Sequence, residues 1–178
     1  VGAAISAAPG AALAQEPLKL GVLVTLEGAF TVLGEDGLRG VELAVQEFGG
    51  EVAGRPIELS IGSSDASPDS AVRAARKLIE EDGVDVIVGP LSGSEGLAIR
   101  DLAKEYPEIT IVNGTSAAQD TTLRNPSENF FRFSTDGAQW MAGLGEYVYN
   151  ELGYRSVAVL AEDYSFPYTQ VQGFMLPF

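Results

Sequence analysis

Residues 84–99 read VDVIVGPLSGSEGLAI and combine three local signals in one stretch. The run 84–88 is apolar and β-branched at every position except Asp85, which is typical of a strand buried inside a parallel sheet. Ser92 and Glu95 follow in the S-x-x-E spacing of a capping box, which predicts that a helix begins at Gly93. A strand, a glycine-rich loop and a capped helix in this order indicate a βαβ unit and therefore an α/β fold.

The alternation of strand and helix continues on both sides of this stretch. Short apolar runs predict strands at residues 18–24, 57–61, 84–88, 109–112, 130–133 and 156–160. Helical spacing of apolar residues predicts helices at about residues 34–48, 68–79, 97–106 (after the capped turn), 138–152 and 168–174. We therefore expect a doubly wound α/β fold, with a parallel sheet that helices cover on both faces.

The first of these helices has one apolar face. Leu38, Val41, Val45 and Phe48 share this face at helical spacing, which is typical of an amphipathic helix. The pair Gly49–Gly50 follows directly, as glycines do at the end of a helix.

The composition excludes several classes of function. The 178 residues include no cysteine and no histidine, so the chain has no thiol nucleophile, no zinc–thiolate site and no Ser-His-Asp triad. Its 11 basic and 25 acidic residues give a formal net charge of −14, which opposes binding to nucleic acid. The sequence also contains no P-loop and no dinucleotide-binding fingerprint. We expect a protein that is not an enzyme and holds no metal or cofactor, although catalysis by Asp and Glu alone stays open.

Residues 1–14 (VGAAISAAPGAALA) are uncharged and consist almost wholly of small or apolar residues. They end in Ala12-Leu13-Ala14, which places small residues where signal peptidase requires them. We interpret this stretch as the remainder of a signal peptide and expect export to the periplasm or the cell surface. An alanine-rich leader outside the fold is the alternative.

Two loops carry small and polar residues where predicted strands end, which is the place at which open α/β sheets bind ligands. In the first, residues 89–96, the backbone N–H groups at the helix start can receive an anion such as a carboxylate. The second, residues 113–119, offers hydroxyl groups and another cap-like pair, Ser116 and Gln119. Helix capping alone would also explain both loops, and Glu95 would compete with an anionic ligand for the helix start.

The order of these features resembles the start of a type I periplasmic binding protein, in the leucine/isoleucine/valine-binding branch that serves ABC importers. The resemblance covers the chain from Leu18 to about Phe174. It rests on the loop 25–29, Gly34 at the start of a helix, the Gly49–Gly50 turn, the segments 65–68, 77–84 and 87–90, the loop 115–118 and the segment 157–164. It implies two lobes of doubly wound sheet that close on a small-molecule ligand, with the membrane permease of an ABC importer as partner.

The resemblance also implies which residues surround the ligand. The loops 28–34, 91–95 and 114–118 would line the wall of the first lobe. Two positions whose hydroxyl groups hold an amino acid in the family fall on Gly93 and Ala117, and an aromatic position of the wall falls on Leu33. The candidate ligand-binding residues are Leu33, Ser92, Gly93, Ser94, Thr115, Ser116, Ala117, Tyr164 and Phe166. Because polar partners are lost and an aromatic lining is left, we expect a hydrophobic or aromatic carboxylate ahead of a branched-chain amino acid.

Members of this family are roughly twice as long as this chain and consist of two lobes. We expect residues 15–135 to form a nearly complete first lobe and residues 136–178 to begin a second one. This expectation favours a truncated or frame-shifted copy, or a cut fragment, over a compact single-lobe protein. Two other functions stay open: a ligand-sensing accessory module of the same fold and, less favoured, an Asp/Glu-dependent hydrolase.

Overall fold

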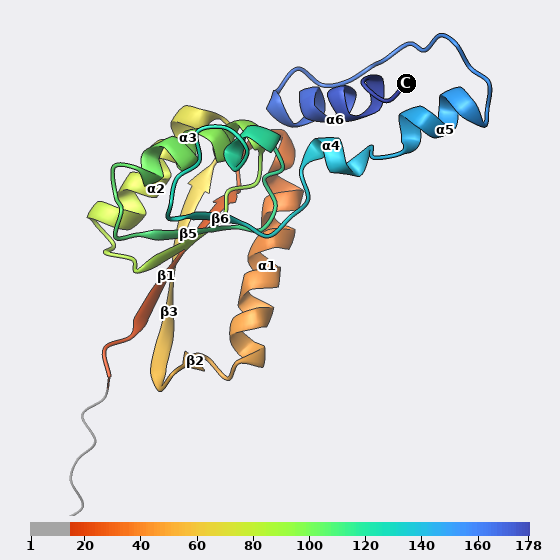
Figure 1. Ribbon diagram of the computed structural model, residues 1–178. Helices are drawn as coiled ribbons and strands as arrows, with labels where there is room; N and C mark the ends of the chain where they lie inside the picture. The colour runs from red at the N-terminus through yellow and green to blue at the C-terminus, as the bar shows by residue number, and fades with distance from the viewer. Residues whose placement is uncertain (1–14) are drawn as a thin grey trace, which may run out of the picture.

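A six-stranded sheet in the order β2-β3-β1-β4-β5-β6 forms the centre of the computed structural model, which describes residues 15–178 (Figure 1). Every neighbouring pair of strands is parallel except β2 and β3, which pair antiparallel. The strands are β1 (Leu18–Thr25), β2 (Glu51–Val52), β3 (Arg55–Ser64), β4 (Val86–Val88), β5 (Thr110–Asn113) and β6 (Phe130–Arg132). The predicted parallel sheet is confirmed. The signal peptide predicted for residues 1–14 lies outside the described residues.

Helices cover both faces of the sheet, as predicted, with α1 on one face and α2 and α3 on the other (Figure 1). Beyond β6 the chain leaves the sheet and forms α4, α5 and α6 to one side of it (Figure 1). The helices are α1 (Thr31–Glu47), α2 (Pro68–Glu80), α3 (Gly93–Ala103), α4 (Gly137–Trp140), α5 (Leu144–Asn150) and α6 (Ser165–Met175), with short 3-10 turns η1 (Gly28–Phe30) and η2 (Gln119–Thr121). Within residues 15–178, no helix combines the length and the apolar character that crossing a membrane requires.

The hydrophobic core lies between the sheet and the layer formed by α2 and α3. Leu23, Ile87 and Ile111 come from the three neighbouring strands β1, β4 and β5, and each is at most 1% exposed. They belong to one cluster with Leu78 of α2 and Ile99 of α3. Burial of this continuous apolar layer is the main favourable term for the sheet and these two helices.

The helix α1 is less buried than its apolar spacing predicts. Leu38, Val41 and Val45 are half-buried, whereas Phe48 is 71% exposed. Phe48 is the C-cap residue of α1, where the chain turns toward β2, so its side chain lies past the part of the helix that faces the sheet. Phe48 therefore ends the apolar face of the helix without being buried against the sheet.

The same helix begins at Thr31, directly after η1, and not at Gly34 as predicted. Gly34 is buried, and a Cβ atom at this position would lie 1.7 Å from the carbonyl oxygen of Thr25. The glycine therefore permits the close approach of α1 to the end of β1, which brings Phe30 and Leu33 next to the carboxyl ends of the strands.

The capping signals in the first half of the chain are confirmed. Ser67 caps α2 by accepting a hydrogen bond from the N–H of Ser70, with Pro68 in the first turn. Ser92 and Glu95 form both hydrogen bonds of a capping box at the start of α3. This helix ends at Ala103 and not at residue 106 as predicted.

The second half of the chain departs further from the prediction. The helix expected at 138–152 is divided into α4 and α5, and the second begins after Gly143, which has a positive φ of 80°. The strand expected at 156–160 is absent: residues 153–162 are irregular and exposed. A strand needs a neighbour for its backbone hydrogen bonds, and no described strand lies beside this segment. The helix expected at 168–174 is confirmed and extends over Ser165–Met175.

Candidate ligand-binding site

A cavity of about 170 Å³ lies at the carboxyl ends of the strands, between the first turn of α3 and the start of α6. Its lining residues are Phe30, Leu33, Leu91, Ser92, Gly93, Thr115, Ala117, Trp140, Tyr164 and Phe166. All the predicted site residues except Ser94 and Ser116 are thus brought together. Phe30 and Leu91 lie in loops that were expected to form the wall, although neither residue was singled out.

Trp140 was not predicted as a site residue at all. It lies at the end of α4, and its ring packs edge-on against Phe166 with 5.1 Å between centroids. Tyr164 lies 6.3 Å from Phe166 and 6.3 Å from Phe30 by the same measure, the latter pair also edge-on. Aromatic rings from η1, α4 and the start of α6 therefore surround one small space, a geometry that suits a further flat ring.

The first turn of α3 forms the polar end of this cavity. The hydroxyl of Ser92 accepts a hydrogen bond from the N–H of Glu95 (3.2 Å) and donates one to the carbonyl of Ala66 (3.1 Å), so it is fully engaged. The backbone N–H of Ser92 donates to Glu95 Oε2 at 2.8 Å. Within residues 15–178, no acceptor is found for the N–H groups of Gly93 and Ser94. These two donors are the part of the helix start that Glu95 leaves available.

Glu95 itself is fully buried and belongs to a polar network below the cavity. Its Oε1 accepts a hydrogen bond from the hydroxyl of Ser64 at 2.5 Å, and this hydroxyl lies 3.1 Å from that of Thr25. These hydrogen bonds connect the ends of β1 and β3 to the first turn of α3. They are strong because all three side chains are buried. Glu95 therefore acts as a structural group and does not line the cavity.

Ser94 faces α6 and not the cavity. Its hydroxyl lies 3.1 Å from that of Ser165, at hydrogen-bonding distance, which joins the first turn of α3 to the first turn of α6. Gly93 lies in the same contact: a Cβ atom there would be 3.0 Å from the Cβ of Phe166 and 3.0 Å from the hydroxyl of Ser165. The missing side chain at residue 93 thus lets the two walls of the cavity approach closely.

The loop after β5 is held from inside by Asn113, which is fully buried. Its side-chain NH₂ donates to the carbonyl of Ser116 at 2.7 Å, and its side-chain oxygen accepts from the N–H of Thr115 at 3.2 Å. This arrangement turns Thr115 and Ala117 toward the cavity and buries Ser116 on the other side, against Gly96. The hydroxyl of Ser116 has no hydrogen-bond partner among the described residues. The predicted cap from Ser116 is wrong, because η2 has Ala118 at its N-cap position and no side-chain cap.

The cavity is electrically neutral in its side chains. None of the residues that line it is acidic or basic. Burial, with a smaller contribution from the negative charge of Glu162, raises the pKa of Tyr164 above its usual value. Its phenol is therefore uncharged at neutral pH. The dipole of α3 therefore places a partial positive charge beside a cavity whose own lining side chains carry none.

The family model for periplasmic binding proteins matches residues 17–175. The chain belongs to the periplasmic binding protein family. The fold is that of the type I members, as predicted, and the relatives that the chain matches are binding proteins and not enzymes.

Curated and solved relatives agree with this assignment. Leu/Ile/Val-binding protein homolog 7 of Brucella abortus is 31% identical over 167 residues, which are 88% of this chain and 41% of the relative. The structure of an ABC transporter substrate-binding protein from Sphaerobacter thermophilus is 35% identical and superposes with a TM-score of 0.79, over 91% of this chain and 44% of that one. A solute-binding protein of an R. palustris ABC transporter, solved in complex with benzoate, is 27% identical with a TM-score of 0.83 and the same coverage.

The chain thus spans less than half the length of the periplasmic binding proteins it matches. The proposed boundary between a first lobe (15–135) and the beginning of a second (136–178) stays a prediction. In the structure, residues of both ranges line the cavity: Leu33, Gly93 and Ala117 come from the first, and Trp140 and Phe166 from the second.

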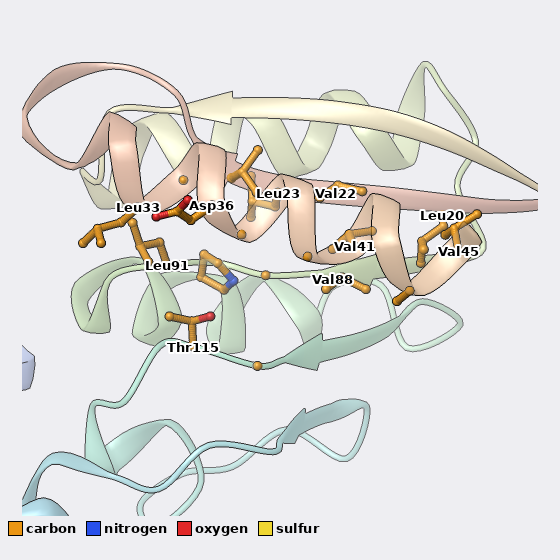
Figure 2. A pocket seen from close by; sticks show the side chains of 18 residues that line it. Leu20, Val22, Leu23, Leu33, Asp36, Val41, Val45, Val88, Leu91 and Thr115 are labelled. Atoms are coloured by element: carbon orange, nitrogen blue, oxygen red, sulfur yellow. The ribbon is translucent and has the colours of Figure 1, made fainter. Parts of the chain in front are cut away.

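A second, larger cavity of about 680 Å³ lies between α1 and the sheet (Figure 2). Figure 2 shows Leu33, Leu91 and Thr115 at one end of it and Leu20 and Val45 at the other. The first three residues also line the smaller cavity, so the two spaces adjoin. Only the end formed by these three residues coincides with the site that the sequence predicts.

Proposed function

We propose that this chain carries the ligand-contacting surfaces of an extracytoplasmic solute-binding protein that serves an ABC importer. We further propose that its ligand is an aromatic carboxylate with a single ring. The observation that carries the proposal is the small, uncharged, aromatic cavity that ends at free N–H groups of α3. The periplasmic location and the permease partner are those expected of a member of this family.

The size of the cavity supports a single ring. A cavity of about 150 Å³ lined by apolar side chains is large enough to bind benzene. The present cavity has about 170 Å³ and is walled by Phe30, Trp140, Tyr164 and Phe166. A ligand with one ring can therefore stack among these side chains.

The polar end of the cavity supports a carboxylate. The N–H groups of Gly93 and Ser94 stand at the positive end of the α3 dipole, and Gly93 lines the cavity with its backbone. Thr115 adds a hydroxyl group to the same wall. These donors can replace the water that a carboxylate loses on entering the cavity.

The same lining disfavours an amino acid. The α-ammonium group of leucine would lose its water without meeting any acidic side chain, because the residues that line the cavity include none. Among the structural relatives, the R. palustris protein was solved with benzoate. This relative, and the absence of an acidic side chain among the described residues that line the cavity, both support an aromatic acid ahead of a branched-chain amino acid.

Isothermal titration calorimetry of the 178-residue chain tests the proposal. We expect benzoate to bind more tightly than leucine or valine, and the neutral analogue benzyl alcohol to bind weakly because it cannot use the anion-binding donors. At ~100 times its dissociation constant, benzoate should also stabilise the folded protein by about 2.7 kcal/mol in a thermal melt. Tighter binding of leucine than of every aromatic acid tested, or no binding of any of them, would refute the proposal.

A further inference from the structure

The chain leaves the sheet through a short junction that contains a buried ion pair. Arg132 is the last residue of β6, and Asp136 is the N-cap residue of α4. Arg132 Nη2 lies 3.6 Å from Asp136 Oδ2, and the two side chains are only 10% and 8% exposed. In every other ion pair among residues 15–178, at least one partner is more than a third exposed. This pair is therefore the one that solvent screens least.

Both residues of the pair also hold other parts of the junction. Arg132 Nη2 donates a hydrogen bond to the hydroxyl of Thr122 at 2.8 Å. Asp136 Oδ1 accepts from the N–H of Gln139, and Gln139 Oε1 accepts from the N–H of Asp136, both at 2.9 Å. Asp136 thus caps α4 with one carboxylate oxygen and meets Arg132 with the other, so the start of α4 is fixed relative to β6.

The position of α4 decides where one wall of the candidate cavity stands. Trp140 is the last residue of this four-residue helix and lines the cavity against Phe166. Its indole N–H donates to the hydroxyl of Thr135, which lies inside the junction. The N–H of Gly137, the first residue of α4, donates to the carbonyl of Ala117 at 2.9 Å, and Ala117 also lines the cavity.

We infer that Arg132 and Asp136 are positioning residues of the ligand site, and that their buried ion pair holds Trp140 in the cavity wall. Neither side chain lines the cavity, so both act through α4. Asp136 is the only carboxylate within ion-pair distance of Arg132 among the described residues, so removal of either partner leaves an unpaired buried charge. The effect on ligand affinity rests on the proposed function, whereas the effect on Trp140 does not.

The variants D136N, R132Q and the double variant separate this role from helix capping. Asparagine caps a helix about as well as aspartate, so D136N removes the charge and keeps the cap. A matched control is R124Q, because Arg124 and Asp120 have the same i, i+4 spacing and the same 3.6 Å separation but are 71% and 40% exposed. Trp140 is the sole tryptophan, so near-ultraviolet circular dichroism reports how firmly its ring is held.

We expect D136N and R132Q each to lose most of the tryptophan dichroism band of the ligand-free protein and to bind benzoate about tenfold more weakly. Because the two residues form one pair, the loss of affinity in the double variant should be closer to that of a single variant than to the sum of the two losses. R132K, which keeps a positive charge, should recover part of both signals. R124Q should match the unmodified protein in both.

Unchanged dichroism and affinity in D136N and R132Q, or equal changes in R124Q, would overturn the inference. A lower melting temperature with the dichroism band and the affinity intact would also overturn it, because the pair would then contribute to stability alone. If the unmodified chain does not bind benzoate, the proposed function fails, and the dichroism of the ligand-free variants still decides whether the pair positions Trp140.

Discussion

Among individual residues, Gly93 lets two walls of the candidate cavity approach closely. It stands in the first turn of α3, where Phe166 and Ser165 of α6 approach so closely that any Cβ atom would touch both. Its backbone conformation does not require glycine, so the requirement is one of space. The same residue lines the cavity with its backbone.

The variant G93A tests this role. We expect the added methyl group to push the start of α6 away, to destabilise the protein by about 1 kcal/mol as overpacking does, and to weaken binding of benzoate. Urea unfolding and calorimetric titration measure the two effects. The control G114A adds a methyl group in the neighbouring loop, where no atom lies within 4 Å. Equal behaviour of the two variants would show that the contact between α3 and α6 is not tight.

At the scale of the element, the segment 156–160 and the strand β4 show how context decides whether an apolar run becomes a strand. Both are rich in valine and both were predicted as strands. β4 lies between β1 and β5, and its Ile87 is fully buried. The segment 156–160 has no described neighbour, and its Leu160 is fully exposed. β-propensity is therefore realised only where a partner strand and a covered face exist.

Hydrogen exchange distinguishes these two segments. We expect the backbone N–H groups of residues 156–160 to exchange at nearly unprotected rates, and those of β4 to exchange only through global unfolding. Mass spectrometry with peptide resolution measures both in one experiment. Protection of 156–160 that disappears on dilution would contradict the expectation, because it would show that this segment pairs with another copy of the chain.

In the molecule as a whole, the net charge and the chemistry of the cavity have opposite effects on an anionic ligand. The net charge of −14 repels an anionic ligand at long range, whereas the cavity receives the anion through backbone donors at short range. Salt screens the first effect and hardly changes the second, since the Debye length falls from ~30 Å at 0.01 M to ~8 Å at 0.15 M. The overall charge therefore affects how fast a ligand arrives more than how tightly it is held.

The rate of ligand association tests whether the net charge affects the arrival of the ligand more than its affinity. We expect the association rate constant of benzoate to rise about twofold or more between low and physiological ionic strength, with little change in the dissociation rate. Stopped-flow fluorescence of Trp140 measures both rates. Benzyl alcohol is the neutral control and should show no dependence on salt. An association rate that falls with added salt would instead indicate a positively charged entrance to the site.

The elements whose signals are local follow from the sequence alone. The capping box of Ser92 and Glu95, the Ser67–Pro68 helix start and the buried β4 run depend on residues a few positions apart, and the structure confirms all three. The same local signals predicted the parallel sheet, and the family resemblance indicated most of the residues that line the candidate cavity.

The direction in which individual side chains face depends on contacts that form only in the folded chain. Ser94 meets Ser165, 71 residues further along the chain, and so turns away from the cavity, while the hydrogen bonds of Asn113 bury Ser116. Trp140 enters the wall because α4 is held to β6 and packs on α6, which no local pattern reports. The physical reason is that capping and periodicity act within a turn or two of the chain, whereas the lining of a cavity depends on contacts between segments that only the fold brings together.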